Sequence, residues 1–394
     1  MQKHKYWLHY FTVLHIVSMA ATLYQNLAFG EILGRLGASA QLFGITGALS
    51  IFALASGLPF GGYLVDKFGG TRTFLLAQKV SFVANILCLL LFFANASLYV
   101  WAAFQIIYGL VASIEVSSRQ HFIYENLPYT TGERGLLSVS FEVTLNGLAK
   151  IIGYAIGSTL LSSSNPMWAF AFNAMTYFAM GYWIHSNLKK HNIVHKTVAH
   201  VKMRFPIKEV WNNAFLRKIF VFETIFAFSL FAINTQAYLL VKNLNTNYNF
   251  GWFLVAASSG SFIVNTLYTR KHGQHFKRNI ILFSITSLIG LGFLIFHTNF
   301  WVCLIGIFLT GASLTNISVI TRAQLHKHVQ TENKGSILSL YQVNWNMWTG
   351  MGTLIFGIMV QYIGFTLSFT MLFSYIALFL LIYLYKEYYH KNIE

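Results

Sequence analysis

Charged residues are scarce in this chain, and acidic residues are the scarcest of them. Of its 394 residues only 10% are Asp, Glu, Lys or Arg, whereas 56% are hydrophobic, and the mean hydropathy is +0.55. A soluble domain of this composition has too little polar surface to cover itself, so its surroundings must be mostly lipid. The composition therefore excludes an ordinary soluble protein and indicates an integral membrane protein.

Other features that the sequence lacks exclude further classes. The chain has two cysteines, Cys88 and Cys303, and both lie in apolar runs, which argues against a disulfide framework. Ten-residue segments of alternating polarity are absent, so helices rather than barrel strands must cross the membrane. The motifs HExxH and GxSxG are also absent, and no two acids share a membrane depth as a catalytic pair. We therefore expect no enzyme activity and no bound cofactor.

Apolar runs of about 20 residues, enough for a helix to cross a hydrocarbon core roughly 30 Å thick, follow one another along the whole chain. They predict an all-α membrane protein with twelve transmembrane helices. The predicted spans are 9–32, 41–65, 73–94, 97–119, 136–161, 166–186, 217–241, 249–269, 279–297, 299–321, 335–361 and 363–385.

The basic residues are distributed unevenly among the connections between these spans. If the N-terminus is cytoplasmic, only Arg35 and Lys242 lie in outer connections, and the other loop Lys and Arg residues lie in inner ones. This asymmetry predicts that both termini are cytoplasmic. It also accounts for the net charge of +16, so we expect contact with membrane lipids and none with nucleic acid.

One long polar connection divides the chain. Residues 189–216 are basic and amphipathic, and we expect a linker on the inner membrane surface. They separate an N-terminal six-helix bundle, 1–188, from a C-terminal one, 217–394. The linker histidines at 191, 195 and 200 have no cysteine or carboxylate to complete a ligand set, so we expect no metal site.

The two halves share a sequence pattern. "RGLLSVSFEVTLNG" at 134–147 aligns with "KGSILSLYQVNWNM" at 334–347, which pairs Glu142 with Gln342 and Asn146 with Asn346. The alignment predicts a duplicated six-helix unit. Parallel repeats of this kind build transporters whose substrate path runs between the halves near the midplane of the membrane.

A short glycine-rich stretch carries a family resemblance. "GYLVDKFGGTR", residues 62–72, resembles the loop between helices 2 and 3 of the major facilitator superfamily, although Gly70 stands where a base is usual. The resemblance implies a twelve-helix transporter that works by alternating access. The matching residues are Gly62, Leu64, Asp66, Lys67, Gly69 and Arg72.

Two further stretches resemble one branch of that superfamily. "SSRQHFIYENLP" at 117–128 and "LNGLAKIIGYAIGS" at 145–158 are similar to bacterial macrolide-type efflux proteins and siderophore exporters. This resemblance implies export across a bacterial cytoplasmic membrane. Two residues depart from ordinary proton–drug exchange: Tyr154 replaces the proline of the helix 5 pattern, and Gln105 replaces an arginine often found in helix 4.

The glycine-rich stretch also has a physical interpretation. The second span must end and reverse within a few residues, which requires glycine backbone freedom, and the glycines at 57, 61 and 62 allow a neighbouring helix to approach. Asp66 then lies at the inner mouth, where Arg119 or the N-terminus of the eleventh span is a candidate partner. Such a contact would be a latch that exists only while the cytoplasmic side is shut, and the alternative is a fixed local salt bridge. The predicted gate residues are Gly62, Asp66, Lys67, Gly69, Arg72 and Arg119.

Charges inside the membrane point to function, because each costs on the order of 2.5–3.5 kcal/mol at the midplane. Glu142, Asn146 and Lys150 recur every four residues and form one polar stripe, with the lysine near the middle of its span. Lys150 is the first candidate for binding a substrate anion or for ion coupling. The alternative is a structural pair with Glu115 or Glu142.

Two other carboxylates are candidates. Glu31 lies one turn before Arg35, so it forms either a surface pair or a site for a cation or a proton. Glu223 has no base nearby in the sequence and is predicted to be a proton carrier, unless it faces a watery vestibule. Amide side chains are expected to line the route or to bond helices together. They are Gln25, Asn26, Asn234, Asn316 and Asn346.

These observations predict a monomeric secondary active transporter that exports a small amphipathic molecule, such as a drug or a siderophore, and is driven by a proton gradient. The aromatic content of 17% suits an apolar or aromatic ligand. The alternatives are the same fold moving another cargo, as a lipid flippase or a nutrient importer, and a membrane sensor that does not transport.

Overall fold

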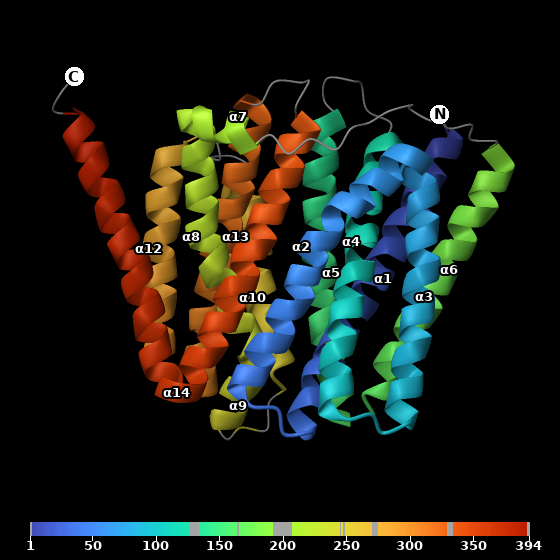
Figure 1. Ribbon diagram of the computed structural model, residues 1–394, viewed down its shortest axis with the longest axis horizontal. Helices are drawn as coiled ribbons and strands as arrows, with labels where there is room; N and C mark the ends of the chain where they lie inside the picture. The colour runs from blue at the N-terminus through green and yellow to red at the C-terminus, as the bar shows by residue number, and fades with distance from the viewer. Residues whose placement is uncertain are drawn as a thin grey trace. The chain divides into compact units, whose positions relative to one another are not determined.

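The computed structural model describes residues 2–126, 134–163, 165–191, 207–244, 246, 249–269, 275–328 and 334–391. Within these ranges every regular element is a helix, as expected when apolar segments must satisfy their backbone hydrogen bonds internally. Figure 1 shows them as ribbons. The first six are α1 (Gln2–Arg35), α2 (Ala40–Phe68), α3 (Gly70–Phe93), α4 (Leu98–Asn126), α5 (Arg134–Ser163) and α6 (Met167–His191).

The later helices depart from the predicted spans in three places. The predicted span 217–241 is divided between two helices, α8 (Ala214–Thr235) and α9 (Ala237–Asn243), which are separated at Gln236. The range 249–269 contains α10 (Gly251–Val264) and the π-helix η1 (Asn265–Thr269). The last two predicted spans fall in one element, α14 (Lys334–Lys391). The remaining helices are α7 (Ile207–Asn212), α12 (Phe276–Ile295) and α13 (Phe300–His328).

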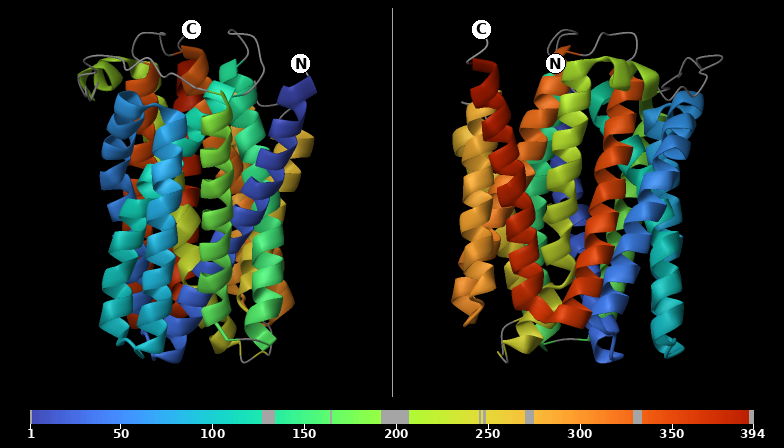
Figure 2. Two further views of the ribbon diagram at one scale, coloured as in Figure 1. Left: turned by 90° about the vertical axis from the view of Figure 1, so that its right-hand side faces the viewer. Right: turned by 60° about the vertical axis from the view of Figure 1, so that its left-hand side comes forward.

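Helix α14 is interrupted at Gly364, which has φ 78° and ψ 173°. A positive φ of this size is readily adopted only by glycine, so the residue separates two helical arms. The arms form a V in Figure 1 and in the right view of Figure 2. The break lies within three residues of the boundary predicted between the last two spans, 335–361 and 363–385.

In the described part of the chain, six helices are long and apolar enough to cross a membrane by length and composition. They lie at Ala40–Phe68, Gly70–Phe93, Leu98–Ile123, Phe276–Ile295, Phe300–Arg322 and Leu340–Lys386. The chain is therefore a multi-pass membrane protein, as predicted. The count of twelve crossings and the cytoplasmic position of the termini stay predictions.

The chain divides into two compact units. The first contains residues 1–38 and 46–205, and the second contains residues 39–45 and 206–394. Residues 192–206 of the predicted linker lie outside the described part, and residues 207–212 of it form α7.

Close packing of α1 against α5 organises the first unit. A Cβ added at Gly153 of α5 would lie 2.7 Å from the Cα of Ala20, and one at Gly157 would lie 3.1 Å from the Cα of Tyr24. Only glycine permits this approach between helices. Helix α1 also contacts α6, and α3 contacts α4 and α6 (Figure 2).

The second unit repeats this arrangement with its own helices. A Cβ at Gly352 of α14 would lie 1.8 Å from the carbonyl oxygen of Phe228 on α8. Helix α13 contacts α8, α10 and α12, and α12 also contacts α14. The first and fifth predicted spans of each half are therefore packed together through glycine.

Candidate functional site

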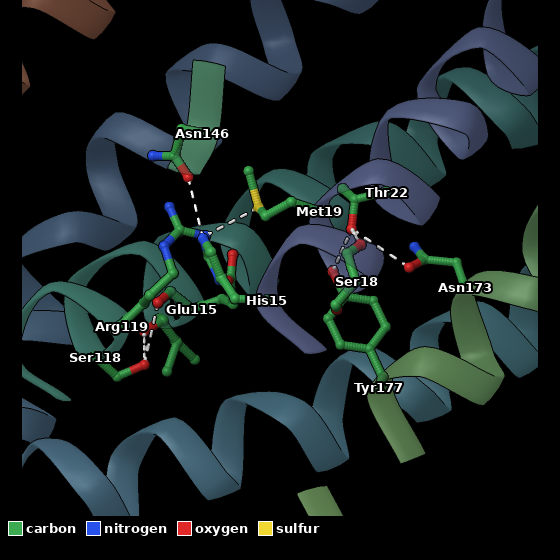
Figure 3. Close-up of polar contacts among 11 residues, drawn as sticks. His15, Ser18, Met19, Thr22, Glu115, Ser118, Arg119, Asn146, Asn173 and Tyr177 are labelled. Carbon is green, nitrogen blue, oxygen red and sulfur yellow. Dashed lines mark hydrogen bonds and ion pairs between the residues drawn. The ribbon is translucent and has the colours of Figure 1, made fainter. Parts of the chain in front are cut away.

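A buried ion pair lies in the first unit where α1 and α4 meet (Figure 3). Arg119 Nη1 donates to Glu115 Oε1 at 2.6 Å and also lies 3.3 Å from the sulfur of Met19 on α1. The side chains of Arg119 and Glu115 are 5% and 14% exposed. Glu115 and Arg119 lie one helical turn apart, and their pair faces the interior of the helix bundle rather than water.

A histidine that the sequence did not single out lies beside this pair. His15 on α1 is 2% exposed, and its Nε2 is 3.2 Å from Oδ1 of Asn146 on α5 (Figure 3). Its ring stacks on Phe11 with a centroid separation of 5.5 Å. A single histidine in an apolar span has no spacing pattern, which explains why sequence analysis missed it.

Lys150 lies on the face of α5 that packs against α1. It is one turn after Asn146 and about one turn before Gly153, and both of these residues contact α1. Their contacts, His15 and Ala20, bracket the stretch of α1 that Lys150 faces. The lysine side chain is half-buried.

No carboxylate contacts Lys150 among the described side chains. Among the described side chains the ion pairs are Glu31–Arg35 and Glu115–Arg119, and neither contains this lysine. The alternative pair with Glu115 is therefore not formed, because Glu115 contacts Arg119. Arg119 contacts Met19, which lies on the same stretch of α1 that Lys150 faces. The Glu142 side chain lies outside the described part.

A neutral polar network lies farther along α1. Thr22 Oγ1 is 3.1 Å from the Tyr177 hydroxyl and 3.3 Å from Asn173 Oδ1, and both partners lie on α6 (Figure 3). Asn173 also donates to Oε1 of Gln25, whose side chain is fully buried. Gln25 therefore bonds helices together, whereas its predicted companion Asn26 is exposed.

In the second unit, hydroxyl groups surround Glu223 of α8. Ser318 and Thr321 of α13 donate to its two carboxyl oxygens at 3.0 and 2.6 Å, and the Tyr341 hydroxyl of α14 is 2.7 Å from Thr321 Oγ1. Glu223 is 0% exposed, which excludes the vestibule interpretation for this structure. In the described part of the unit it has no ion pair. The nearby base Arg322 donates to Gln342 Oε1 at 3.1 Å.

The remaining predicted site residues are placed as follows. Glu31 and Arg35 form an ion pair of 2.9 Å, and the arginine side chain is 54% exposed, which matches the surface-pair alternative. Asn316 donates to the carbonyl of Ala312 at 2.7 Å and to that of Ser261 on α10 at 3.2 Å. Asn346 donates to a carbonyl of its own helix at 2.8 Å. The Asn234 side chain lies outside the described part.

The glycine-rich stretch forms the predicted reversal. Gly69 has φ 82° between α2 and α3, so the expected glycine backbone freedom is confirmed. Asp66 and Arg72 are exposed, and Lys67 lies 5.2 Å from the ring of Phe68. The predicted contact of Asp66 with Arg119 is not formed in this structure, because Arg119 points into its own bundle and pairs with Glu115.

The helix-approach prediction is partly wrong. Added Cβ atoms at Gly57 and Gly61 would lie 2.2 Å from Ser113 Oγ and 2.9 Å from the Ser113 carbonyl oxygen, so these glycines do admit α4. A Cβ at Gly62 would have no atom within 4 Å, so this glycine admits no neighbour.

Comparison with known proteins defines the family. Residues 11–294 match the model described as Major Facilitator Superfamily. The chain belongs to this superfamily. No curated protein matches the sequence. The fold, the glycine-rich reversal after α2 and the helical pairing in both units agree with the resemblance seen in the sequence.

Solved structures of transporters share the fold. A structure of the nucleoside transporter NupG matches with a TM-score of 0.69 and 11% identity, covering 95% of this chain and 97% of that one. The human organic anion transporter MFSD10 (TETRAN) matches with 0.69 and 13%, covering 94% and 98%. A bacterial homologue of the iron transporter ferroportin, in an inward-facing state, matches with 0.68 and 11%, covering 98% of both chains. This superfamily chain thus has a transporter fold.

Proposed function

We propose that this transporter exports a small amphipathic molecule in exchange for protons, and that Glu223 carries the proton. The observation that supports the proposal is the surroundings of Glu223. A buried carboxylate is unfavourable unless it is neutralised, paired or well hydrogen-bonded. Its hydrogen-bond partners Ser318 and Thr321 have hydroxyl groups, which donate to a carboxylate and equally accept from a carboxylic acid.

The hydrogen bonds can be satisfied in both protonation states. When Glu223 is ionised, Ser318 and Thr321 donate to its oxygens and Tyr341 donates to Thr321. When Glu223 is protonated, it donates to Thr321, whose own hydrogen can turn to the carbonyl of Ile317 or Ser318, each 3.0 Å away. Neither state leaves a buried donor without an acceptor, so the site suits repeated proton uptake and release.

The same hydrogen bonds link the proton to the helices. Glu223 lies on α8, Thr321 on α13 and Tyr341 on α14, so protonation changes which bonds join three helices of the second unit. Such a change biases a protein between two conformations of similar energy. A proton entering down the membrane potential contributes about 2.3 kcal/mol per 100 mV to drive the cycle.

The experiment uses the full chain in proteoliposomes and a panel of fluorescent amphipathic molecules of both charges. We expect an imposed proton gradient to drive transport of a panel member by the parent protein, and Glu223→Gln to abolish that gradient dependence. Exchange of the same molecule without a gradient should persist in the variant, because only the proton carrier is lost. Glu209→Gln is the control, since Glu209 is an exposed carboxylate on α7 of the same unit.

Three outcomes would contradict the proposal. Parental rates and parental pH dependence in Glu223→Gln would show that the proton binds elsewhere. Gradient-driven accumulation in the direction of import would show that the chain is not an exporter. Binding of a panel member without any exchange would favour the alternative of a membrane sensor.

A further inference from the structure

We infer that the cargo carries an anionic group, and that the ammonium of Lys150 in the first unit binds it. This inference rests on the proposed function and adds the chemical class of the cargo. It depends on three observations: the charges around the α1 stretch from His15 to Ala20, the partial exposure of Lys150, and the aromatic ring next to it.

The charges around this stretch do not cancel. Arg119 and Lys150 are both cationic, and Glu115 is the one carboxylate that the described contacts place there. At 2.6 Å from Arg119, Glu115 compensates the guanidinium. Glu142 lies two turns before Lys150 on the same helix, about 12 Å along the axis, which is too far for the i,i+4 type of contact. Among the side chains that the structure describes, no carboxylate therefore contacts Lys150.

A bound anion would supply a counter-ion. An ammonium removed from water without a counter-ion is strongly unfavourable, and intramembrane charges accordingly face a partner or a cavity. A cationic cargo would instead meet the like charge of Lys150, and this repulsion is strong at low dielectric. The balance of charge thus selects an anion over a neutral or cationic molecule of the same size.

The side chains around this stretch differ in how fully their polar groups are already bonded. Arg119 and His15 are both buried. Arg119 already contacts Glu115, and His15 already contacts Asn146. Lys150 is half-buried. A half-buried lysine beside an arginine that already pairs with Glu115 suits a single carboxylate better than a group with several charges.

The next turn of α5 supplies an apolar surface. Tyr154 lies four residues after Lys150 and is half-buried, so its ring and the ammonium lie on the same side of the helix. A carboxylate at Lys150 would place the apolar part of an amphipathic molecule beside this ring. The inferred ligand class is therefore an amphipathic monocarboxylate with an aromatic or aliphatic body.

The test measures binding to the purified full chain in lipid nanodiscs, independently of any proton gradient. The probes are two sets matched in size: 1-naphthoate, 1-naphthamide and 1-naphthylmethylammonium, and octanoate, octanamide and octylammonium. In the parent we expect at least one carboxylate to bind about ten-fold more tightly than its amide, since a charge-assisted hydrogen bond is lost in the amide. The ammonium probes should bind more weakly still.

Three variants identify the lysine as the cause. Lys150→Gln should remove the preference for the carboxylate, and Lys150→Arg should keep most of it because the charge remains. Lys79→Gln, which changes an exposed lysine on α3, should bind every probe as the parent does. Thermal unfolding of each variant shows whether it is folded.

The inference is overturned if the parent prefers no carboxylate over its amide, or if folded Lys150→Gln keeps the preference. Its failure is distinct from failure of the proposed function. Gradient-driven transport that is indifferent to the charge of the cargo would refute the anion site alone. Carboxylate binding that depends on Lys150, without any proton dependence of transport, would refute the role of Glu223 alone.

Discussion

The polar clusters of the two units have opposite chemistry on a repeated scaffold. The cluster of the first unit contains two cations, Arg119 and Lys150, and Glu115 pairs with the arginine. The second contains the acid Glu223, held by hydroxyl groups of α13 and α14. In both units, glycine brings the first and fifth predicted spans together. The comparison shows that the two units share close glycine packing between these helices while their buried polar side chains differ.

A pair of aligned residues shows how this divergence works. Asn146 and Asn346 occupy equivalent places in the repeat, yet Asn146 contacts His15 on another helix and Asn346 donates to the carbonyl of Gln342 on its own helix. The same amide therefore joins two helices in one unit, whereas its described bond in the other lies within one helix. We interpret the first cluster as the part that recognises charge on the cargo and the second as the part that binds the proton.

The largest expected effect tests the shared scaffold. Gly352→Val should prevent stable folding, because a Cβ there would lie 1.8 Å from a backbone oxygen of α8, and overpacking at such a contact costs roughly 3 kcal/mol or more. Gly62→Ala is the matched control: with no atom within 4 Å, it should be neutral or stabilising by up to about 1 kcal/mol. Yield of monodisperse protein and thermal unfolding measure both. Equal behaviour of the two variants would contradict the packing described here.

The next effect compares the arginines of the two clusters. Glu115→Ala removes the carboxylate from the buried Arg119 and should destabilise the protein by about 3 kcal/mol. Gln342→Ala removes a neutral partner from half-buried Arg322 and should cost only about 1 kcal/mol. The measurement is the thermal unfolding midpoint in one detergent. If the unfolding midpoint fell as far in Gln342→Ala as in Glu115→Ala, the buried ion pair would not stabilise its arginine more than a neutral hydrogen bond does.

A smaller effect concerns the proton site. Thr321→Val removes a hydroxyl that donates to ionised Glu223 and accepts from the protonated acid. The bond to the charged form is the stronger of the two, so the charged form loses about 1 kcal/mol more. Because the ionised form is then less favoured, protons bind at higher pH, and the midpoint of gradient-driven transport should shift to higher pH. Thr321→Ser should restore the parental profile, which a defect of packing would not do. An unchanged pH profile in folded Thr321→Val would exclude Thr321 from the proton site.

The smallest effect tests the aligned asparagines. Asn146→Ala should destabilise the protein by about 1 kcal/mol, since it removes the hydrogen bond between His15 on α1 and Asn146 on α5. Asn346→Ala should cost a few tenths of that, because its bond lies within one helix. Chemical unfolding of both variants gives the difference. A larger cost at Asn346 would reverse the contrast between the two units.

Sequence reasoning predicted the features that depend on local pattern. Hydropathy indicated multiple helical membrane segments, and the glycine-rich stretch predicted the reversal at Gly69, which has a positive φ. The buried acid Glu223 was also identified, since one charge in an apolar span is conspicuous. These signals lie within a few neighbouring residues and need no knowledge of tertiary structure.

The contacts that complete each cluster could not be predicted in this way. The hydroxyls around Glu223 lie almost a hundred residues later in the sequence, and Ser, Thr and Tyr are too common in membrane helices to indicate a site. Arg119 was assigned to the gate because it lies near a span end, but its side chain points into the bundle. The direction of a side chain depends on helix rotation, which hydropathy does not determine.

The most direct test of the central claim measures proton-driven transport and gradient-free exchange of one carboxylate probe in the same proteoliposomes. The division of roles predicts that Glu223→Gln loses proton-driven transport yet exchanges the probe, whereas Lys150→Gln loses both for the carboxylate but not for its amide. If Glu223→Gln transports the probe with the parental dependence on the gradient, or if Lys150→Gln exchanges carboxylate and amide as the parent does, the two clusters do not have the separate functions assigned to them.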